Sequence, residues 1–79
     1  MKYVYLLRSR SNSSKVYTGL TDEPARRLEE HNSGKSPFTS RDVPWEIETL
    51  IGFKDAHRAA AFERYLKTGS GIAFARRQL

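Results

Sequence analysis

Three side chains at short intervals in the first half of the chain suggest proton transfer and anion binding. Tyr17 and His31 are candidate proton acceptors, and Arg27 between them is a permanent cation suited to an anionic substrate. Tyr5 lies upstream, and Glu63 lies further along and offers a carboxylate of the kind that binds hard divalent cations. No other combination in the chain brings together a candidate base, a cation for an anionic substrate and a metal-binding carboxylate.

The two tyrosines lie on segments that read as paired strands. Residues 2–8 are β-prone and almost continuously apolar, which predicts a strand covered on both faces. The Ser-rich stretch that follows predicts a turn, and residues 16–18 predict a short strand that returns in a hairpin. Tyr5 and Tyr17 belong to these strands, and Gly19 then permits a bend or a close backbone approach.

The arginine and the histidine lie on a predicted helix. Thr21 and Asp22 are good N-caps for a helix over residues 23–32, which ends at an Asn-Ser-Gly stop signal. Arg27 and His31 are four residues apart and therefore project from the same face of this helix.

A loop and a third strand follow. Residues 32–44 are polar, and a loop of that length in so small a domain is more often functional than not. Apolar and polar residues alternate over residues 45–53, which predicts a strand that completes a three-stranded sheet. Strands followed by helices in this order predict an α+β fold.

Glu63 lies on a second predicted helix, which runs from its N-cap Asp55 to about Thr68. The Gly-Ser-Gly segment 69–71 predicts the end of this helix, and residues 72–79 predict a short basic terminal helix. The carboxylate shares a face with several alanines and a leucine, so its burial requires a partner.

A metal ion is one partner that Glu63 could have. An ion pair with Lys67, four residues further on, is the alternative.

The charge balance favours a polyanionic partner such as nucleic acid. Fourteen Lys and Arg against nine Asp and Glu give a net charge of +5, although a basic surface can also serve solubility alone. The basic residues expected to contact nucleic acid lie in a central and a C-terminal stretch: Arg26, Lys35, Arg41, Arg64 and Lys67.

Length and composition exclude several other classes. A chain of 79 residues predicts one domain, residues 1–79, with a small core. The absence of Cys excludes a disulfide framework, and two His alone cannot complete a structural zinc site. Nothing resembles a signal peptide, and no apolar run approaches the ~18 residues of a membrane span. We therefore expect a soluble cytoplasmic protein with no membrane partner.

Over nearly its whole length the chain resembles the GIY-YIG nuclease superfamily, and most of all its small stand-alone members. The first family tripeptide corresponds to Tyr3-Val4-Tyr5 and the second to Tyr17-Thr18-Gly19. The ten-residue step from Tyr17 to Arg27, the further four-residue step to His31 and the later helical Glu63 complete the match.

The resemblance implies a three-stranded antiparallel sheet flanked by helices and a metal-dependent endonuclease that hydrolyses phosphodiester bonds. DNA is implied more than RNA, with structure or strand preference and a link to DNA repair. The implied active-site residues are Tyr5, Tyr17, Arg27, His31 and Glu63. Glu63 would hold one Mg²⁺ or Mn²⁺, Arg27 would bind phosphate oxygens, and Tyr5 would position the water or the phosphate.

Two points stay open at this level. Tyr17 is the base by family analogy, but an ordinary Tyr titrates near 10 and His31 nearer to 6.5, so either can be the base. Repair and homing members of the family carry an Asn a dozen or so residues after the metal-binding Glu. The residues that this chain offers there are Ser70, Ala75 and Gln78.

The replaced Asn and the small size motivate an alternative, a nucleic-acid-binding module of the same fold that does not cleave. A third hypothesis is a protein interaction domain that uses Trp45 and the long loop.

Overall fold

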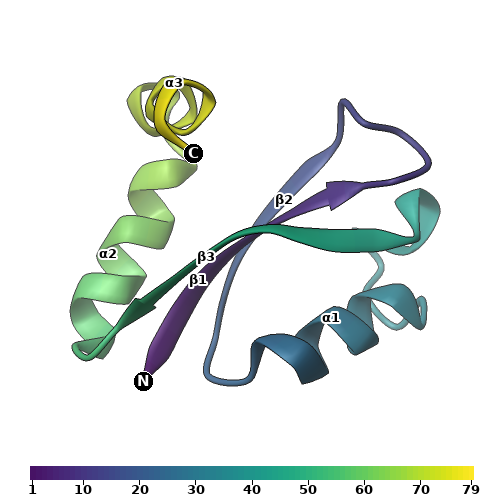
Figure 1. Ribbon diagram of the computed structural model, residues 1–79, viewed down its shortest axis with the longest axis horizontal. Coiled ribbons are helices and arrows are strands. Elements are labelled where there is room, and N and C mark those ends of the chain that lie inside the picture. The colour runs from purple at the N-terminus through teal and green to yellow at the C-terminus, as the bar shows by residue number, and fades with distance from the viewer.

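The computed structural model describes all 79 residues as a three-stranded antiparallel sheet with helices on both faces (Figure 1). The strands, in the spatial order β2-β1-β3, are β1 (Lys2–Ser9), β2 (Val16–Thr21) and β3 (Trp45–Phe53). The helices are α1 (Pro24–Asn32), α2 (Ala56–Leu66) and α3 (Gly69–Gln78), with a 3₁₀ turn at Ser40–Asp42. The expected α+β fold is therefore confirmed. No helix is long and apolar enough to cross a bilayer.

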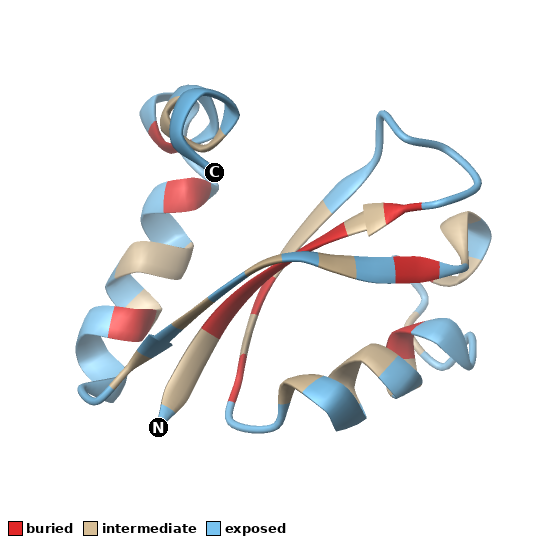
Figure 2. Cartoon of the chain, in the orientation of Figure 1, coloured by how far each residue is buried: buried red, intermediate tan, exposed pale blue.

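The central strand β1 separates two small hydrophobic clusters. Val4 and Leu6 pack with α2, whereas Tyr5 and Leu7 pack with Trp45 and with α1 on the other face. Figure 2 shows the buried residues concentrated along the middle of the sheet, with exposed residues on the outer sides of the helices. This alternation agrees with the prediction of a strand covered on both faces.

A bulge lets the edge strand β3 contribute to both clusters. Leu6 pairs with Thr49 and Leu7 pairs with Ile47, so Glu48 is an extra residue that has no partner on β1. The extra residue changes the phase of the alternation. Ile47 therefore packs on the α1 side, whereas Phe53 packs on the α2 side.

Strand β2 is longer than predicted, and α1 begins differently. β2 continues to Thr21, so Gly19 lies inside the strand and not at a bend. The expectation that Thr21 or Asp22 caps the helix is wrong. The Thr21 hydroxyl accepts a hydrogen bond from the Glu23 backbone N–H (3.1 Å), and Glu23 occupies the N-cap without a side-chain bond. Pro24 favours the start of the helix in another way. Its fixed φ suits the first turn, and it has no backbone N–H that would need a partner there.

The predicted stop signal does end α1. The backbone N–H of Ser33 donates to the Glu29 carbonyl (2.9 Å), and Gly34 has a φ of 79°. This left-handed conformation favours glycine, because a side chain would be strained there.

The Gly-Ser-Gly segment was wrongly expected to end α2. Asp55 caps α2 as predicted, through bonds from His57 N–H (2.8 Å) and Arg58 N–H (3.2 Å), but the helix ends at Leu66. Thr68 then caps α3, because its hydroxyl accepts from Gly71 N–H (3.1 Å), so the glycines form the first turn of α3. A β-carbon at Gly71 would overlap the backbone of α2, so glycine permits the tight corner.

Asn32, the last residue of α1, joins that helix to the start of β3. Its side-chain amide donates to the Trp45 carbonyl (3.0 Å), and its Oδ1 accepts from the Trp45 backbone N–H (2.6 Å). The side chain thereby replaces a neighbouring strand at this end of β3.

We expect Asn32→Ala to lower the free energy of unfolding by about 1–3 kcal/mol, because it leaves a backbone donor and acceptor of Trp45 without partners. Asn32→Asp should also destabilise, since a carboxylate oxygen would then face the Trp45 carbonyl. Asn12→Ala, in the exposed hairpin turn, is the matched control with a smaller loss. Urea unfolding measures all three, and a midpoint unchanged in Asn32→Ala would contradict this account.

Candidate active site

The rings of Tyr5, Tyr17 and His31 meet between β1, β2 and the end of α1. The hydroxyl of Tyr5 and Nε2 of His31 share a buried hydrogen bond of 3.0 Å. The ring centroids of Tyr17 and His31 are 4.7 Å apart, and those of the two tyrosines are 6.2 Å apart. Three residues that the sequence places far apart are therefore in contact.

Thr39, which the sequence reasoning missed, completes this cluster. Nδ1 of His31 and the Thr39 hydroxyl share a second buried hydrogen bond of 2.9 Å, and the Thr39 carbonyl accepts from Trp45 Nε1 (2.9 Å). Both ring nitrogens of His31 are thus engaged, and the side chain is fully buried. The only sequence signal was the position of Thr39 in the long loop before Trp45, whose buried indole N–H needs an acceptor.

Gly19 makes room for Tyr5. The two residues are paired across β1 and β2, and a β-carbon at Gly19 would overlap the phenol ring of Tyr5. Of the two roles expected for Gly19, the structure shows the close approach.

The buried pair is electrically neutral near pH 7. Burial raises the pKa of Tyr5 above 10.0, although the nearby Arg27 guanidinium opposes this shift. Burial, followed by the charge of Arg27, lowers the pKa of His31 below 6.5. Both changes follow from the cost of placing a charge in a poorly solvated site.

Arg27 lies at the solvent side of this neutral cluster. Its Nη1 donates to Glu30 Oε1 at 2.9 Å, and both side chains are 39% exposed. This contact holds the pKa of the Glu30 carboxyl below its ordinary value, so the pair is charged at neutral pH. The guanidinium also lines a shallow pocket of about 390 Å³ together with Tyr17, Lys35 and Phe38.

Glu63 stands apart from the aromatic cluster, on α2 against the other face of the sheet. Its carboxylate is ion-paired with Lys67, and its side chain is 14% exposed, the least of the four ion-paired carboxylates. No hydrogen bond or ion pair joins Glu63 to Tyr5, Tyr17 or His31. The structure also contains no group of three or more His, Asp or Glu side chains placed to hold a metal ion.

Tyr17 connects the two parts of the candidate site. Besides the pocket beside Arg27, it lines a groove of about 810 Å³ between the sheet and helices α2 and α3, and it is the one residue common to both. Lys67, the partner of Glu63, lines the same groove. Arg27 and Lys67, the ion-pair partner of Glu63, therefore line different cavities that share Tyr17.

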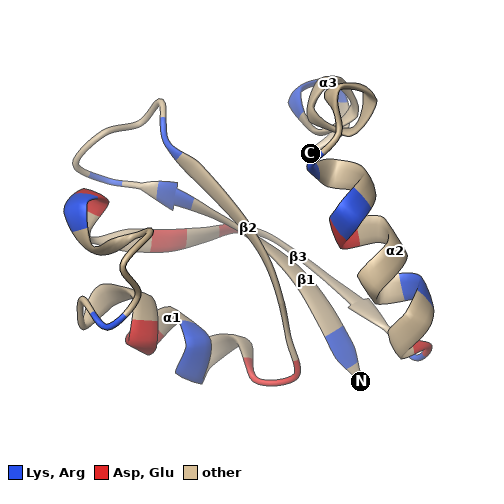
Figure 3. Cartoon of the chain, turned by 180° about the vertical axis from the view of Figure 1, so that it is seen from behind, with Lys and Arg blue, Asp and Glu red and all other residues tan.

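The basic residues expected to contact nucleic acid lie at the surface, and Figure 3 shows Lys and Arg on both α1 and α2 with acidic neighbours on each helix. Arg26 pairs with Glu23 at 2.9 Å, whereas Lys35 lies in the pocket beside Arg27. Arg41 and Arg64 are exposed and make no ion pair.

Comparison with known proteins gives a consistent result. A family model described as the GIY-YIG catalytic domain matches residues 1–72. Three similar proteins are each called structure-specific endonuclease subunit SLX1. The one from Talaromyces marneffei is 48% identical over 65 residues, that from Podospora anserina 42% over 66, and that from Cryptococcus neoformans 40% over 65. The matches cover 75–76% of this chain, which spans only 13–19% of the length of these relatives.

The burial of His31 predicts a specific pH dependence of stability. Its folded pKa lies below the unfolded value near 6.5, so the unfolded chain binds a proton more readily at this residue. The free energy of unfolding should therefore be greatest above about pH 6.5 and should fall as the pH falls, by at most about 1.4 kcal/mol per pH unit. The ring faces Tyr5, Tyr17, Arg27 and Glu30, and Glu30 alone opposes the shift.

His31→Gln should reduce this acid-side slope between about pH 7 and pH 5, even though it lowers stability overall. His57→Gln is the matched control, because His57 is exposed at the start of α2. Urea unfolding at several pH values gives the slopes. Equal slopes for the wild type and His31→Gln would show that the imidazole is not held neutral.

Proposed function

The chain belongs to the GIY-YIG catalytic domain family, and we propose that it is an endonuclease that hydrolyses phosphodiester bonds in DNA with structure selectivity. One observation of the site carries the proposal. The buried bonds from Thr39 through His31 to Tyr5 hold a rigid wall, against which Tyr17 and Arg27 line one pocket open to solvent. The names of the SLX1 relatives support the choice of substrate.

We assign Arg27 to the scissile phosphate. Its planar guanidinium matches two phosphate oxygens and stays charged at every working pH. The ion pair with Glu30 is exposed, so a phosphate can replace the carboxylate at little cost.

We assign the base to Tyr17 and a positioning role to His31. A base must reach the attacking water, and His31 is fully buried with both nitrogens engaged. Tyr17 is partly exposed and lines the pocket. Its phenol oxygen would accept the proton of the water, and Arg27 lines the same pocket. Tyr5 was expected to position the water or the phosphate, but it is buried and hydrogen-bonded to His31, so we assign it to positioning the neighbouring Tyr17 ring.

The family uses a divalent metal ion, and Glu63 is the residue that would hold it here. The donor chemistry fits, because a hard cation such as Mg²⁺ keeps most of its waters and needs only one or two carboxylates. The Glu63 carboxylate already binds one cation, the ammonium of Lys67. When bound, the metal would neutralise charge on the phosphoryl oxygens.

A module that binds DNA without cutting it is the second candidate. The Glu63–Lys67 pair favours it, because that pair occupies the carboxylate that a metal would need. The chain also has no Asn at the position of the family Asn. Ser70 lies in the first turn of α3, and the one side-chain amide of this segment, that of Gln78, lies at the end of the helix.

Plasmid, single-stranded and branched DNA, incubated with the protein in Mg²⁺ or Mn²⁺, distinguish the two functions. We expect Arg27→Ala and Tyr17→Phe to lower the cleavage rate about 10²- to 10³-fold, because each removes a group that acts on the reacting atoms. Arg26→Ala is the matched control and should stay within a few-fold of wild type. Cleavage that survives both active-site changes would point to a contaminating nuclease, and binding without cleavage would favour the module.

Lys67→Met should strengthen Mn²⁺ binding about two- to fivefold, because it removes the ammonium that competes for the Glu63 carboxylate through an ion pair of modest strength. Glu63→Gln should abolish the binding, and Arg64→Met, which removes a neighbouring unpaired cation, should leave it unchanged. Titration calorimetry of the DNA-free protein with Mn²⁺ measures this without reference to activity. Equal affinities for the wild type and Glu63→Gln would refute the assignment of the metal to Glu63.

A further inference from the structure

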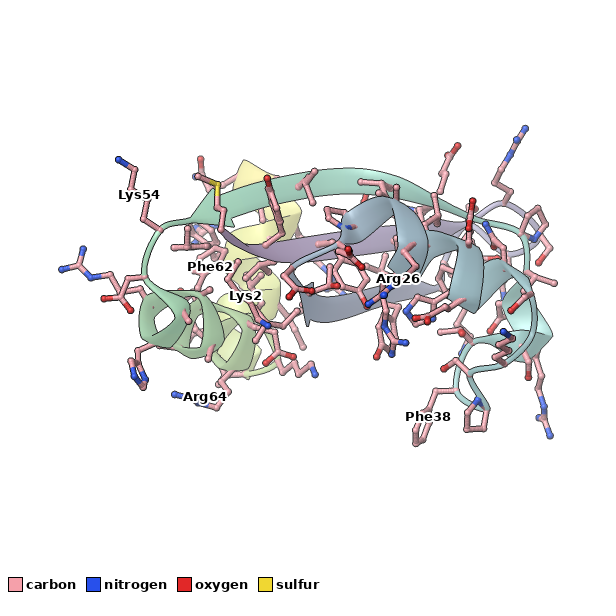
Figure 4. The ribbon with its side chains drawn as sticks, turned by 90° about the horizontal axis from the view of Figure 1, so that it is seen from below. Lys2, Arg26, Phe38, Lys54, Phe62 and Arg64 are labelled. Carbon is pink, nitrogen blue, oxygen red and sulfur yellow. The ribbon has the colours of Figure 1, made fainter.

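Phe38 is an aromatic side chain that the folded protein leaves in water. It is 84% exposed, more than any other large hydrophobic residue, and Figure 4 shows it projecting from the loop between α1 and β3. Packing in the hydrophobic core therefore does not explain why an aromatic residue stands at this position. A lone exposed apolar residue is common, so its surroundings decide whether it has a role.

The loop holds Phe38 in a fixed place beside the proposed active site. The next residue, Thr39, is buried and bonded to His31, and the backbone N–H groups of Thr39 and Ser40 both donate to the Ser36 carbonyl (3.3 and 3.1 Å). The backbone of Phe38 is thus held by its neighbour Thr39, which is hydrogen-bonded to the imidazole of His31. Because the loop backbone is already held, binding has to fix only the side-chain torsions of Phe38.

The chemistry around Phe38 suits a nucleotide. Phe38 lines the same pocket as Tyr17, Arg27 and Lys35, and Lys35 makes no ion pair. An aromatic face next to basic side chains is the combination by which proteins bind single-stranded nucleic acid, with phosphates on the cations and a base on the ring.

Only an unpaired base can use this ring. Inside a duplex, both faces of a base are covered by its neighbours, so a protein ring can stack only on a base that is single-stranded, terminal or displaced. With a phosphate at Arg27, a ring at the edge of the same pocket lies within reach of a nucleotide close to that phosphate.

We propose that Phe38 is a stacking platform for an unpaired base near the scissile phosphate, and that it selects DNA in which a single strand meets a duplex. This inference rests on the proposed nuclease function and deepens it. Phe38 is a specificity-determining residue, whereas the chemistry belongs to Tyr17 and Arg27.

The test compares a flap, in which a single strand leaves a duplex, with a fully paired duplex of the same length. A 2-aminopurine is placed in the flap next to the junction. Binding is measured by fluorescence anisotropy at one fixed salt concentration, without divalent metal so that the DNA stays intact, since phosphate contacts depend on salt. The proteins are wild type, Phe38→Ala, Phe38→Trp, and Leu50→Ala as an exposed apolar control on β3 that lines neither cavity.

We expect Phe38→Ala to weaken flap binding about five- to one-hundredfold and duplex binding less than twofold. Phe38→Trp should restore the affinity, and the wild type and Phe38→Trp should quench the 2-aminopurine fluorescence where Phe38→Ala does not. Leu50→Ala should match the wild type.

Two results would overturn the proposal. Equal loss of flap and duplex binding would make Phe38 a general contact, and unchanged binding to both would leave the ring free for a different partner, such as a protein. Either result leaves the nuclease function standing if Arg27→Ala still lowers the cleavage rate about 10²- to 10³-fold. Conversely, flap-specific stacking without any cleavage would retain the role of Phe38 and reject the nuclease.

Discussion

The rest of the structure depends on one buried histidine that is kept neutral with both ring nitrogens bonded. Burying a polar group without a hydrogen-bond partner costs roughly 2–7 kcal/mol of folding free energy. The imidazole of His31 therefore depends on its hydrogen bonds with Tyr5 and Thr39. Each bond fixes a different part of the chain relative to α1. Tyr5 belongs to the central strand, and Thr39 belongs to the long loop between α1 and β3. The backbone carbonyl of Thr39 in turn accepts a hydrogen bond from the indole N–H of Trp45, at the start of β3.

Local signals predicted most of the elements, whereas contacts between distant residues decided what the sequence could not show. β3 was predicted with its observed bounds, because alternation is a property of neighbouring residues, and Asp55 was recognised as a cap for the same reason. The bulge at Glu48 arises because two helical layers must share one edge strand. Thr39 joins the site only because the loop folds back onto His31. The resemblance implied that Tyr17, His31 and Glu63 share one site, but it did not indicate that the imidazole would be buried or that Glu63 would pair with Lys67.

The sheet divides the candidate site into two halves. Tyr5, His31 and Arg27 belong to the α1 side, whereas Glu63 belongs to α2, and the edge strand β2 places Tyr17 where the two cavities meet. A domain of 79 residues cannot enclose a deep pocket. Tyr17 on the edge strand is instead shared by two open cavities, one on each side of the sheet, which are lined by Arg27 and by Lys67.

A core this small also cannot bury charge, which determines how the charged groups are held. The buried Tyr5 and His31 are neutral, whereas Arg27 and Lys67 lie at the surface, where each pairs with a carboxylate three or four residues away: Arg27 with Glu30, and Lys67 with Glu63. The Arg27–Glu30 pair is exposed, and exposed pairs contribute at most about 1 kcal/mol, so in the proposed function a phosphate can replace Glu30 without disturbing the fold. Binding of substrate then becomes an exchange of partners at the surface, while the buried bonds of His31 keep the geometry unchanged.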